Sequence, residues 1–141
     1  MKFKQVIGVD LVDMKFNDAQ VILLNVVCWG TGSQQAEVLP SKESKAVTQA
    51  FAKIWKQHYG VPDLIVGDQG GEFTGDPWCQ FSADNGIVLH FIDSGTPWQQ
   101  GRTERAGGLL KEQLQTAIRE ASVTTSQEFA LAVSEAVDAR N

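Results

Sequence analysis

Hydrophobic and polar residues alternate along the first part of the chain, as they do in β-strands that bury one face. Gly, Ser, Asn and Asp gather between the alternating segments and are typical of turns. Because the connections are short, the pattern predicts an antiparallel meander of three strands. These strands are expected at residues 6–12, 20–28 and 34–39.

The rest of the chain carries helical periodicity, interrupted by two short apolar runs. Asp76 and Pro77 are typical of an N-cap and a first helical turn, and Thr125 and Glu128 of a capping box. A helical crossover between the third and fourth strands allows the fourth to run parallel to its neighbour. Helices are expected at residues 44–59 and 76–86, from residue 101 onward and from residue 125 onward, and strands at residues 64–67 and 87–92.

Together these elements predict an α/β domain with a five-stranded mixed sheet, flanked by helices. The chain has 141 residues, 43% hydrophobic and 21% charged, which suits one domain with a core of its own. Helical periodicity continues to the last residues. We therefore expect a single domain, residues 1–141, excised from a longer protein.

The charge balance restricts the possible partners. Lys and Arg number 12 against 17 Asp and Glu, a net charge of −5, so bulk positive charge is excluded as a means of binding nucleic acid. Such binding needs local cations, metal ions or other parts of a longer protein. Cys28 and Cys79 stand far apart without His or Cys at zinc-ligand spacing, which indicates reduced thiols in an intracellular protein and no structural zinc. No apolar run approaches membrane-spanning length, so we expect no membrane partner.

Three carboxylates come from three different predicted elements: Asp10 from the first strand, Asp68 from the end of the fourth, and Glu104 from the helix after the fifth. If the first strand lies beside the fourth, Asp10 and Asp68 are neighbours, and a helix across the sheet can bring Glu104 to them. Clustered carboxylates repel one another unless a cation lies among them. Hard oxygen ligands suit Mg²⁺ or Mn²⁺, and two such ions promote in-line displacement at a phosphodiester.

Each acid also has a purely structural interpretation. Asp13 is a rival for the role of Asp10, but strand alternation places it on the opposite face. Asp68 in the sequence Asp-Gln-Gly-Gly is, taken alone, a turn former, and Glu104 is an acid that the helix N-terminus favours. The combination of all three on suitable elements favours the metal site.

The order of elements and the surrounding motifs resemble the catalytic core of retroviral and retrotransposon integrases, a family within the ribonuclease H-like superfamily. Thirty-five residues separate Asp68 from Glu104, as in the D,D-35-E pattern of that family. The resemblance covers nearly the whole chain. It is carried by Val9-Asp10, the block from Asp68 to Phe73, Gly86-Ile87, the segment from Pro97 to Glu104, and Lys111.

The resemblance implies roles for individual residues. Asp10, Asp68 and Glu104 match the catalytic, metal-binding triad, and Gln100 and Lys111 match positions that contact the DNA end. Residues 94–101 match a mobile active-site loop. Gly95 departs from the aromatic residue that some members carry there, so we expect Trp98 to pack on the DNA end instead. Structural roles stay open: Gln100 and Lys111 as helix polar residues, and Trp98 packed on the domain.

The implied activity is that of a polynucleotidyl transferase: two-metal 3′-end processing, followed by strand transfer joining element DNA to target DNA. The implied partners are element ends, target DNA and other copies of the chain, in a homodimer or higher oligomer. The exposed face of the helix at residues 44–59 is the candidate contact surface. The implied location is intracellular, in a host-cell nucleus or virion, within a longer polyprotein or integrase. Two alternatives remain: a ribonuclease H-like metal-dependent nuclease, and a non-catalytic dimerising module.

Overall fold

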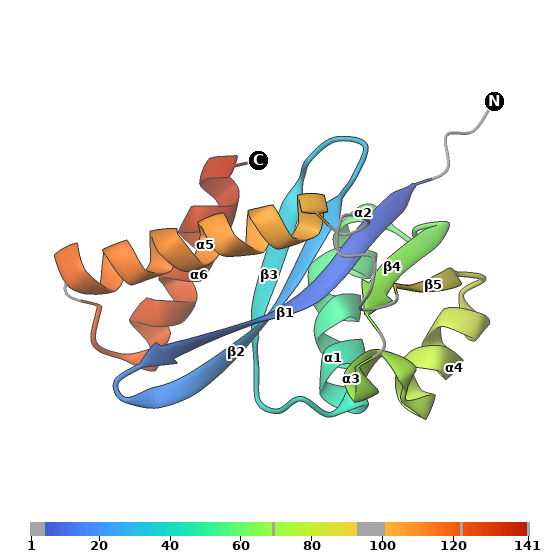
Figure 1. Cartoon of the computed structure of the whole chain (residues 1–141), viewed down its shortest axis with the longest axis horizontal. Coiled ribbons are helices and arrows are strands. Elements are labelled where there is room, and N and C mark those ends of the chain that lie inside the picture. Colours follow the sequence, from blue (N-terminus) through green and yellow to red (C-terminus); the bar gives the residue numbers. More distant parts are fainter. Residues whose placement is uncertain (1–4, 69, 93–100, 122, 141) are drawn as a thin grey trace.

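A computed structural model of the chain describes residues 5–68, 70–92, 101–121 and 123–140. Its centre is a five-stranded sheet with the strand order β3-β2-β1-β4-β5 (Figure 1). The first three strands form an antiparallel meander, and β4 and β5 run parallel to β1, which confirms the predicted mixed sheet. The strands are β1 (Val6–Phe16), β2 (Ala19–Cys28), β3 (Gln34–Leu39), β4 (Leu64–Asp68) and β5 (Val88–Ile92).

The β1–β2 hairpin is longer than the sequence pattern predicts, because β1 continues four residues past Val12, to Phe16. Asp13 and Lys15 interrupt the apolar pattern, yet Met14 and Phe16 keep the alternation and are buried. Asn17 and Asp18 both adopt positive φ, 53° and 62°, as a tight two-residue hairpin turn requires. The hairpin therefore extends beyond the sheet centre and offers an additional apolar surface to the C-terminal helices.

The helices follow the prediction with three differences. The predicted helix at residues 44–59 contains a wider π-helical turn in its middle. A short helix at residues 71–74, which the sequence pattern does not indicate, precedes the predicted one. The prediction that Asp76 is an N-cap is wrong, because Gly75 occupies the cap and Asp76 is already helical. The segments are α1 (Ser44–Phe51), η1 (Ala52–Lys56), α2 (Gln57–Tyr59), α3 (Gly71–Thr74), α4 (Asp76–Asp84), α5 (Gly101–Glu120) and α6 (Ser126–Arg140).

The helices bury the two faces of the sheet in separate cores. On one face, α1, η1 and α4 pack Phe51, Trp55 and Trp78 against Ile7 and Val9 of β1. On the other face, α5 and α6 cover the even-numbered side of β1 and the hairpin. The sheet is thus a layer between two helical layers (Figure 1).

The last helix begins as predicted. The Thr125 hydroxyl accepts a hydrogen bond from the Glu128 amide at 3.1 Å, and the Glu128 carboxylate accepts one from the Thr125 amide at 3.1 Å, which confirms the capping box. Phe129 then packs on Phe16 with ring centroids 4.8 Å apart. Over the part of the chain that the structure describes, no helix combines the length and apolar character needed to cross a membrane.

Candidate active site

Asp10 and Asp68 lie on the same face of the sheet. In the parallel pairing of β1 with β4, Gly8 is opposite Val66, and each acid follows two residues later on its own strand. Residues two apart in a strand share a face, so the two carboxylates point to the side that α5 covers. The parallel crossover through α1 thus brings together two acids that are far apart in the sequence.

Asp10 is an acid in a largely buried position. Burial raises the pKa of its carboxyl to about 7 from an ordinary 3.8, the hydrogen bond from Asn25 opposes the rise, and the charges of Glu104 and Asp68 add to it. Both other acids therefore lie within electrostatic range of Asp10. Asp10 therefore carries its charge where water screens it less than at the open surface, with two further acids nearby.

Glu104 is exposed in the first turns of α5, which crosses β1. Gly107, one turn later, allows this close approach: a Cβ there would lie 3.1 Å from Val12 Cγ2 and 3.1 Å from Asn25 Nδ2. Asp68 is exposed at the end of β4, and its Oδ1 accepts a hydrogen bond from the Gly70 amide at 2.8 Å. Asp68 therefore forms the turn that its sequence indicates and still faces the site.

The three acids are near one another without converging on one point. In residues 5–68, 70–92, 101–121 and 123–140, no three Asp, Glu, His or Cys side chains are arranged to hold a metal ion. The donor set nevertheless fits a hard divalent cation, because it consists of carboxylate oxygens. One of these carboxyls, that of Asp10, has its pKa raised by burial and further by its two acidic neighbours. A cation among them would remove the repulsion that burial makes costly. Asp10, Asp68 and Glu104 are the residues that would hold it.

Sequence reasoning missed the buried polar residues that surround Asp10. Asn25, Gln34 and Thr103 are each fully buried, and Asn25 donates a hydrogen bond from Nδ2 to Asp10 Oδ1 at 2.9 Å. A signal was present: Asn25 interrupts the apolar run of β2, and a buried amide needs hydrogen-bond partners. Those partners are contributed by β3 and α5, which an isolated strand pattern does not reveal.

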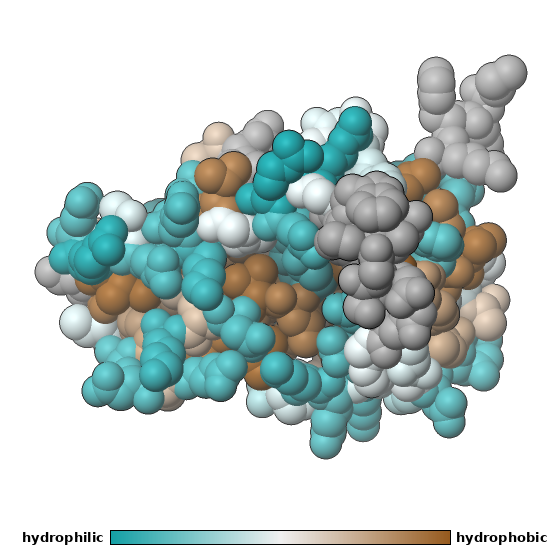
Figure 2. Space-filling model, in the orientation of Figure 1, coloured by the Kyte–Doolittle hydropathy of each residue, from teal (hydrophilic) through white to brown (hydrophobic). Residues whose placement is uncertain are grey.

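Lys111 lies two turns beyond Glu104 on α5 and is half-buried. It lines a groove of about 400 Å³ between α5 and the β1–β2 hairpin, together with Lys15 and Gln115. Figure 2 shows this side of the molecule as mostly hydrophilic, with hydrophobic atoms gathered along the hairpin beneath α5. The predicted contacts Gln100 and Trp98, and Gly95 with them, fall outside the residues that the structure describes.

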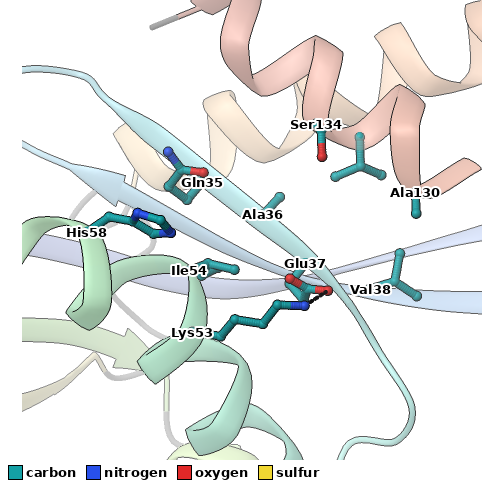
Figure 3. Close-up of a pocket in the computed structure, with 10 residues that line it drawn as sticks. Gln35, Ala36, Glu37, Val38, Lys53, Ile54, His58, Ala130 and Ser134 are labelled. Carbon is teal, nitrogen blue, oxygen red and sulfur yellow. Dashed lines mark hydrogen bonds and ion pairs between the residues drawn. The ribbon is translucent and has the colours of Figure 1, made fainter.

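A second concavity, of about 380 Å³, opens beside the edge strand β3, between η1 and α6 (Figure 3). Glu37 and Lys53 form an ion pair within it at 3.4 Å, and His58 and Ser134 also line it. None of the predicted site residues is among its lining residues. It is therefore a separate surface from the acidic site.

Comparison with known proteins relates this geometry to a fold. No protein-family model matches the sequence, and no curated protein matches it. The catalytic core domain of HTLV-2 integrase, solved in complex with magnesium in a trimeric form, matches with a TM-score of 0.80 at 18% identity, over 95% of this chain and 82% of that one. The chain has the fold of a retroviral integrase catalytic core.

Two further structures share this integrase core fold. The catalytic core domain of BIV integrase matches with a TM-score of 0.74 at 23% identity, over 94% of this chain and 80% of that one. A chain of the simian T-cell lymphotropic virus intasome, in complex with the PP2A regulatory subunit B56 gamma, matches with a TM-score of 0.81 at 18% identity, over 92% of this chain and 47% of that one. At these identities the likeness shows the ribonuclease H-like fold, and the roles of individual residues stay predictions.

Proposed function

We propose that the chain is an integrase catalytic core that performs metal-dependent phosphodiester chemistry on DNA. The observation that carries the proposal is the placement of Asp10 and Asp68 on one sheet face, with Glu104 of α5 within electrostatic range, in a domain with the fold of integrase cores. The magnesium complex of HTLV-2 integrase supports Mg²⁺ as the ion. Fold alone would not suffice, because one fold hosts several activities.

In the proposed site, Asp10, Asp68 and Glu104 would hold Mg²⁺ or Mn²⁺, with two ions expected when DNA is bound. Bound ions of this kind activate the attacking oxygen and stabilise the leaving oxygen at a phosphodiester. The protein's own contribution is to position oxygen ligands: β1 and β4 supply two from a rigid sheet, and α5 supplies the third. The reaction trims a 3′ end with water and then joins the exposed hydroxyl to target DNA, as the resemblance to integrases implies.

The test combines activity and metal binding. Asp10→Asn, Asp68→Asn and Glu104→Gln should each abolish Mn²⁺-dependent cleavage and joining of a DNA duplex while the circular dichroism spectrum is retained. Asp13→Asn is the matched control, because Asp13 lies on the opposite face and pairs with Lys42 at 3.6 Å. Crystals soaked in Mn²⁺ should show anomalous signal among the three acids. Full activity in any triad variant would refute the proposal.

The same assay distinguishes an integrase core from a ribonuclease H-like nuclease. An RNA–DNA hybrid offered beside the duplex should remain intact if the domain is an integrase core. Degradation of the hybrid without joining of the duplex would instead assign a ribonuclease H-like nuclease. Both reactions use the same ions and fold, so only the products distinguish them.

We further propose that the chain acts on DNA as a homodimer or higher oligomer, in a host-cell nucleus or virion. HTLV-2 integrase cores solved in dimeric and trimeric forms support self-association. The proposed contact is the exposed face of α1, η1 and α2, which ends at the exposed Tyr59; His58 and Lys53 from the same segments line the concavity in Figure 3. Lys53→Glu leaves two like charges, Glu37 and the new carboxylate, on this face of each copy, so copies that meet through it should repel and the sedimentation equilibrium should shift to monomer. A wild type that is monomeric at micromolar concentration would contradict this.

A further inference from the structure

A chain of buried amides connects Asp10 to the first turns of α5. Asn25 is fully buried opposite Asp10 in the β1–β2 ladder. Its Nδ2 donates to Asp10 Oδ1 at 2.9 Å and to the Thr103 carbonyl at 3.1 Å. Asn25 therefore binds the acid in the sheet and the helix backbone beside Glu104 with the same amide nitrogen.

Gln34 extends this connection from β3. Its Nε2 donates to Asn25 Oδ1 at 2.6 Å and to the Ala106 carbonyl at 3.2 Å, and the side chain is fully buried. The arrangement sets the orientation of the Asn25 amide, because reversing it would turn its oxygen toward the Asp10 carboxylate and the Thr103 carbonyl. Two buried amides thus act as one rigid unit.

The α5 carbonyls that receive these bonds belong to Thr103 and Ala106, on either side of Glu104 in the sequence. Thr103 is held a second time, since its hydroxyl accepts a hydrogen bond from Trp29 Nε1 at 3.0 Å. The rotation and height of this helical turn are therefore set by the sheet. Glu104 is placed by contacts that its neighbours make.

The amide unit also determines which Asp10 oxygen remains available. Oδ1 is bound by Asn25, and Oδ2 faces α5, 3.6 Å from where a Cβ of residue 107 would lie. Residue 107 is one helical turn from Glu104. Buried amides are costly unless every polar group is paired, and apolar residues of similar shape would fill this interior at lower cost. The presence of the amides of Asn25 and Gln34 beside an acid therefore indicates a role beyond packing.

We propose that Asn25 and Gln34 are positioning residues that hold Asp10 and the Glu104 turn of α5 in one fixed relation, so that both carboxylates are presented to the same divalent cation. This rests on the proposed function, because it assumes that Asp10 and Glu104 bind the ion. Residues that orient metal ligands typically change metal affinity or activity by about 10–100-fold when they are replaced.

The test measures Mn²⁺ affinity directly, by electron paramagnetic resonance of the free ion, on protein that circular dichroism shows to be folded. Asn25→Leu keeps the shape and removes the hydrogen bonds, and it should weaken Mn²⁺ binding by about tenfold or more. Ser82→Ala is the matched control: its hydroxyl is equally buried and donates to the Trp78 carbonyl at 2.9 Å, on α4, away from the acids. It should lower stability and leave Mn²⁺ affinity unchanged.

The outcomes separate the inference from the proposed function. If wild type binds Mn²⁺ no better than Asp10→Asn, the proposed metal site is refuted. If wild type binds at the acids and Asn25→Leu binds equally well, the positioning role is refuted while the metal site stands. If Asn25→Leu does not fold, Gln34→Met is the second variant. It leaves the Asp10 bond in place and removes its support, so a several-fold loss of affinity is expected and wild-type affinity would overturn the inference.

Discussion

Replacing Asp10 by Asn should stabilise the metal-free protein at pH 8. The carboxyl of Asp10 is largely buried beside Asn25, and Glu104 and Asp68 lie within electrostatic range, so ionisation in the folded state is unfavourable and its pKa rises to about 7. Asparagine has the same shape and keeps an oxygen that can accept the hydrogen bond from Asn25 Nδ2. The substitution therefore removes the charge and little else.

The magnitude follows from the two pKa values. At about 1.36 kcal/mol per pKa unit, the difference between 3.8 and about 7 corresponds to about 4 kcal/mol at pH 8, and we expect about 2–4 kcal/mol because side chains and water adjust to the charge. The pKa of Asp10 is higher in the folded state than in the unfolded state, so proton binding to Asp10 stabilises the folded wild type. This contribution is fully present below pH 3.8 and is lost as pH rises through 7. The advantage of Asp10→Asn should therefore shrink to less than half at pH 5.

Urea denaturation of wild type and Asp10→Asn in EDTA, at pH 8 and pH 5, measures both quantities. Asp13→Asn on the opposite exposed face is the control and should change the free energy of unfolding little at either pH. Adding Mn²⁺ should stabilise wild type and reduce the difference, because a ligand that binds only the folded state raises its stability. An Asp10→Asn protein that is less stable than wild type in EDTA at pH 8 would refute the electrostatic reasoning.

Three further predictions concern the DNA-contact position Lys111, the packing of α5 on β1, and the start of α6. Lys111→Ala should weaken binding equally for all DNA sequences, and the slope of log affinity against log salt concentration should fall by the amount expected for about one phosphate contact. Fluorescence anisotropy at several salt concentrations measures this slope, and an unchanged slope would contradict the prediction. Gly8→Ala places a Cβ onto the Thr103 hydroxyl and 2.6 Å from Trp29 Nε1, so urea denaturation should show a loss of at least about 2 kcal/mol. The control Gly108→Ala meets nothing within 4 Å and should gain about 0.5–1 kcal/mol; equal effects would rule out the clash. Thr125→Ala removes the α6 cap and should cost about 1 kcal/mol, measured in the same way, and no loss would mean that the cap contributes nothing.

The sheet could be predicted because each strand has a recognisable pattern in its own stretch of sequence. Alternation in β1 and β2, the turn residues between them, and the apolar runs of β4 and β5 each identify a strand without reference to the others. The helical crossover before β4 then fixes its direction relative to β1. The predicted end of β1 at Val12 is too early, because Asp13 and Lys15 alternate with the buried Met14 and Phe16 and the strand pattern continues to Phe16. Met14 and Phe16 belong to the core that α5 and α6 close.

The surroundings of the acids could not be predicted from patterns of this kind. Asp10 can be identified because it is a polar residue in an apolar strand, and Asn25 in β2 has the same property. The role of Asn25, however, depends on its hydrogen bonds with residues from β3 and α5. Such contacts join positions as far apart as 72 and 78 residues, and no periodicity encodes them. The wrong cap at Asp76 is a related case: Gly75 is the N-cap of α4. The Trp78 amide in the first turn of that helix donates to Ser44 Oγ of α1 at 3.1 Å, a partner 34 residues away.

The amide network also explains how the fold tolerates an acid in the centre of its sheet. An isolated carboxylate on β1 would be costly to bury, and Asn25 reduces that cost by a hydrogen bond to Oδ1. Asn25 in turn bonds Gln34 and the Thr103 carbonyl of α5, and Gln34 bonds the Ala106 carbonyl, so the stability of the acid and the docking of the helix are coupled. A change that loosens α5 should therefore perturb Asp10 even without touching it. The repulsion that remains, from Glu104 and Asp68, is the part that the amides do not relieve and that a cation would.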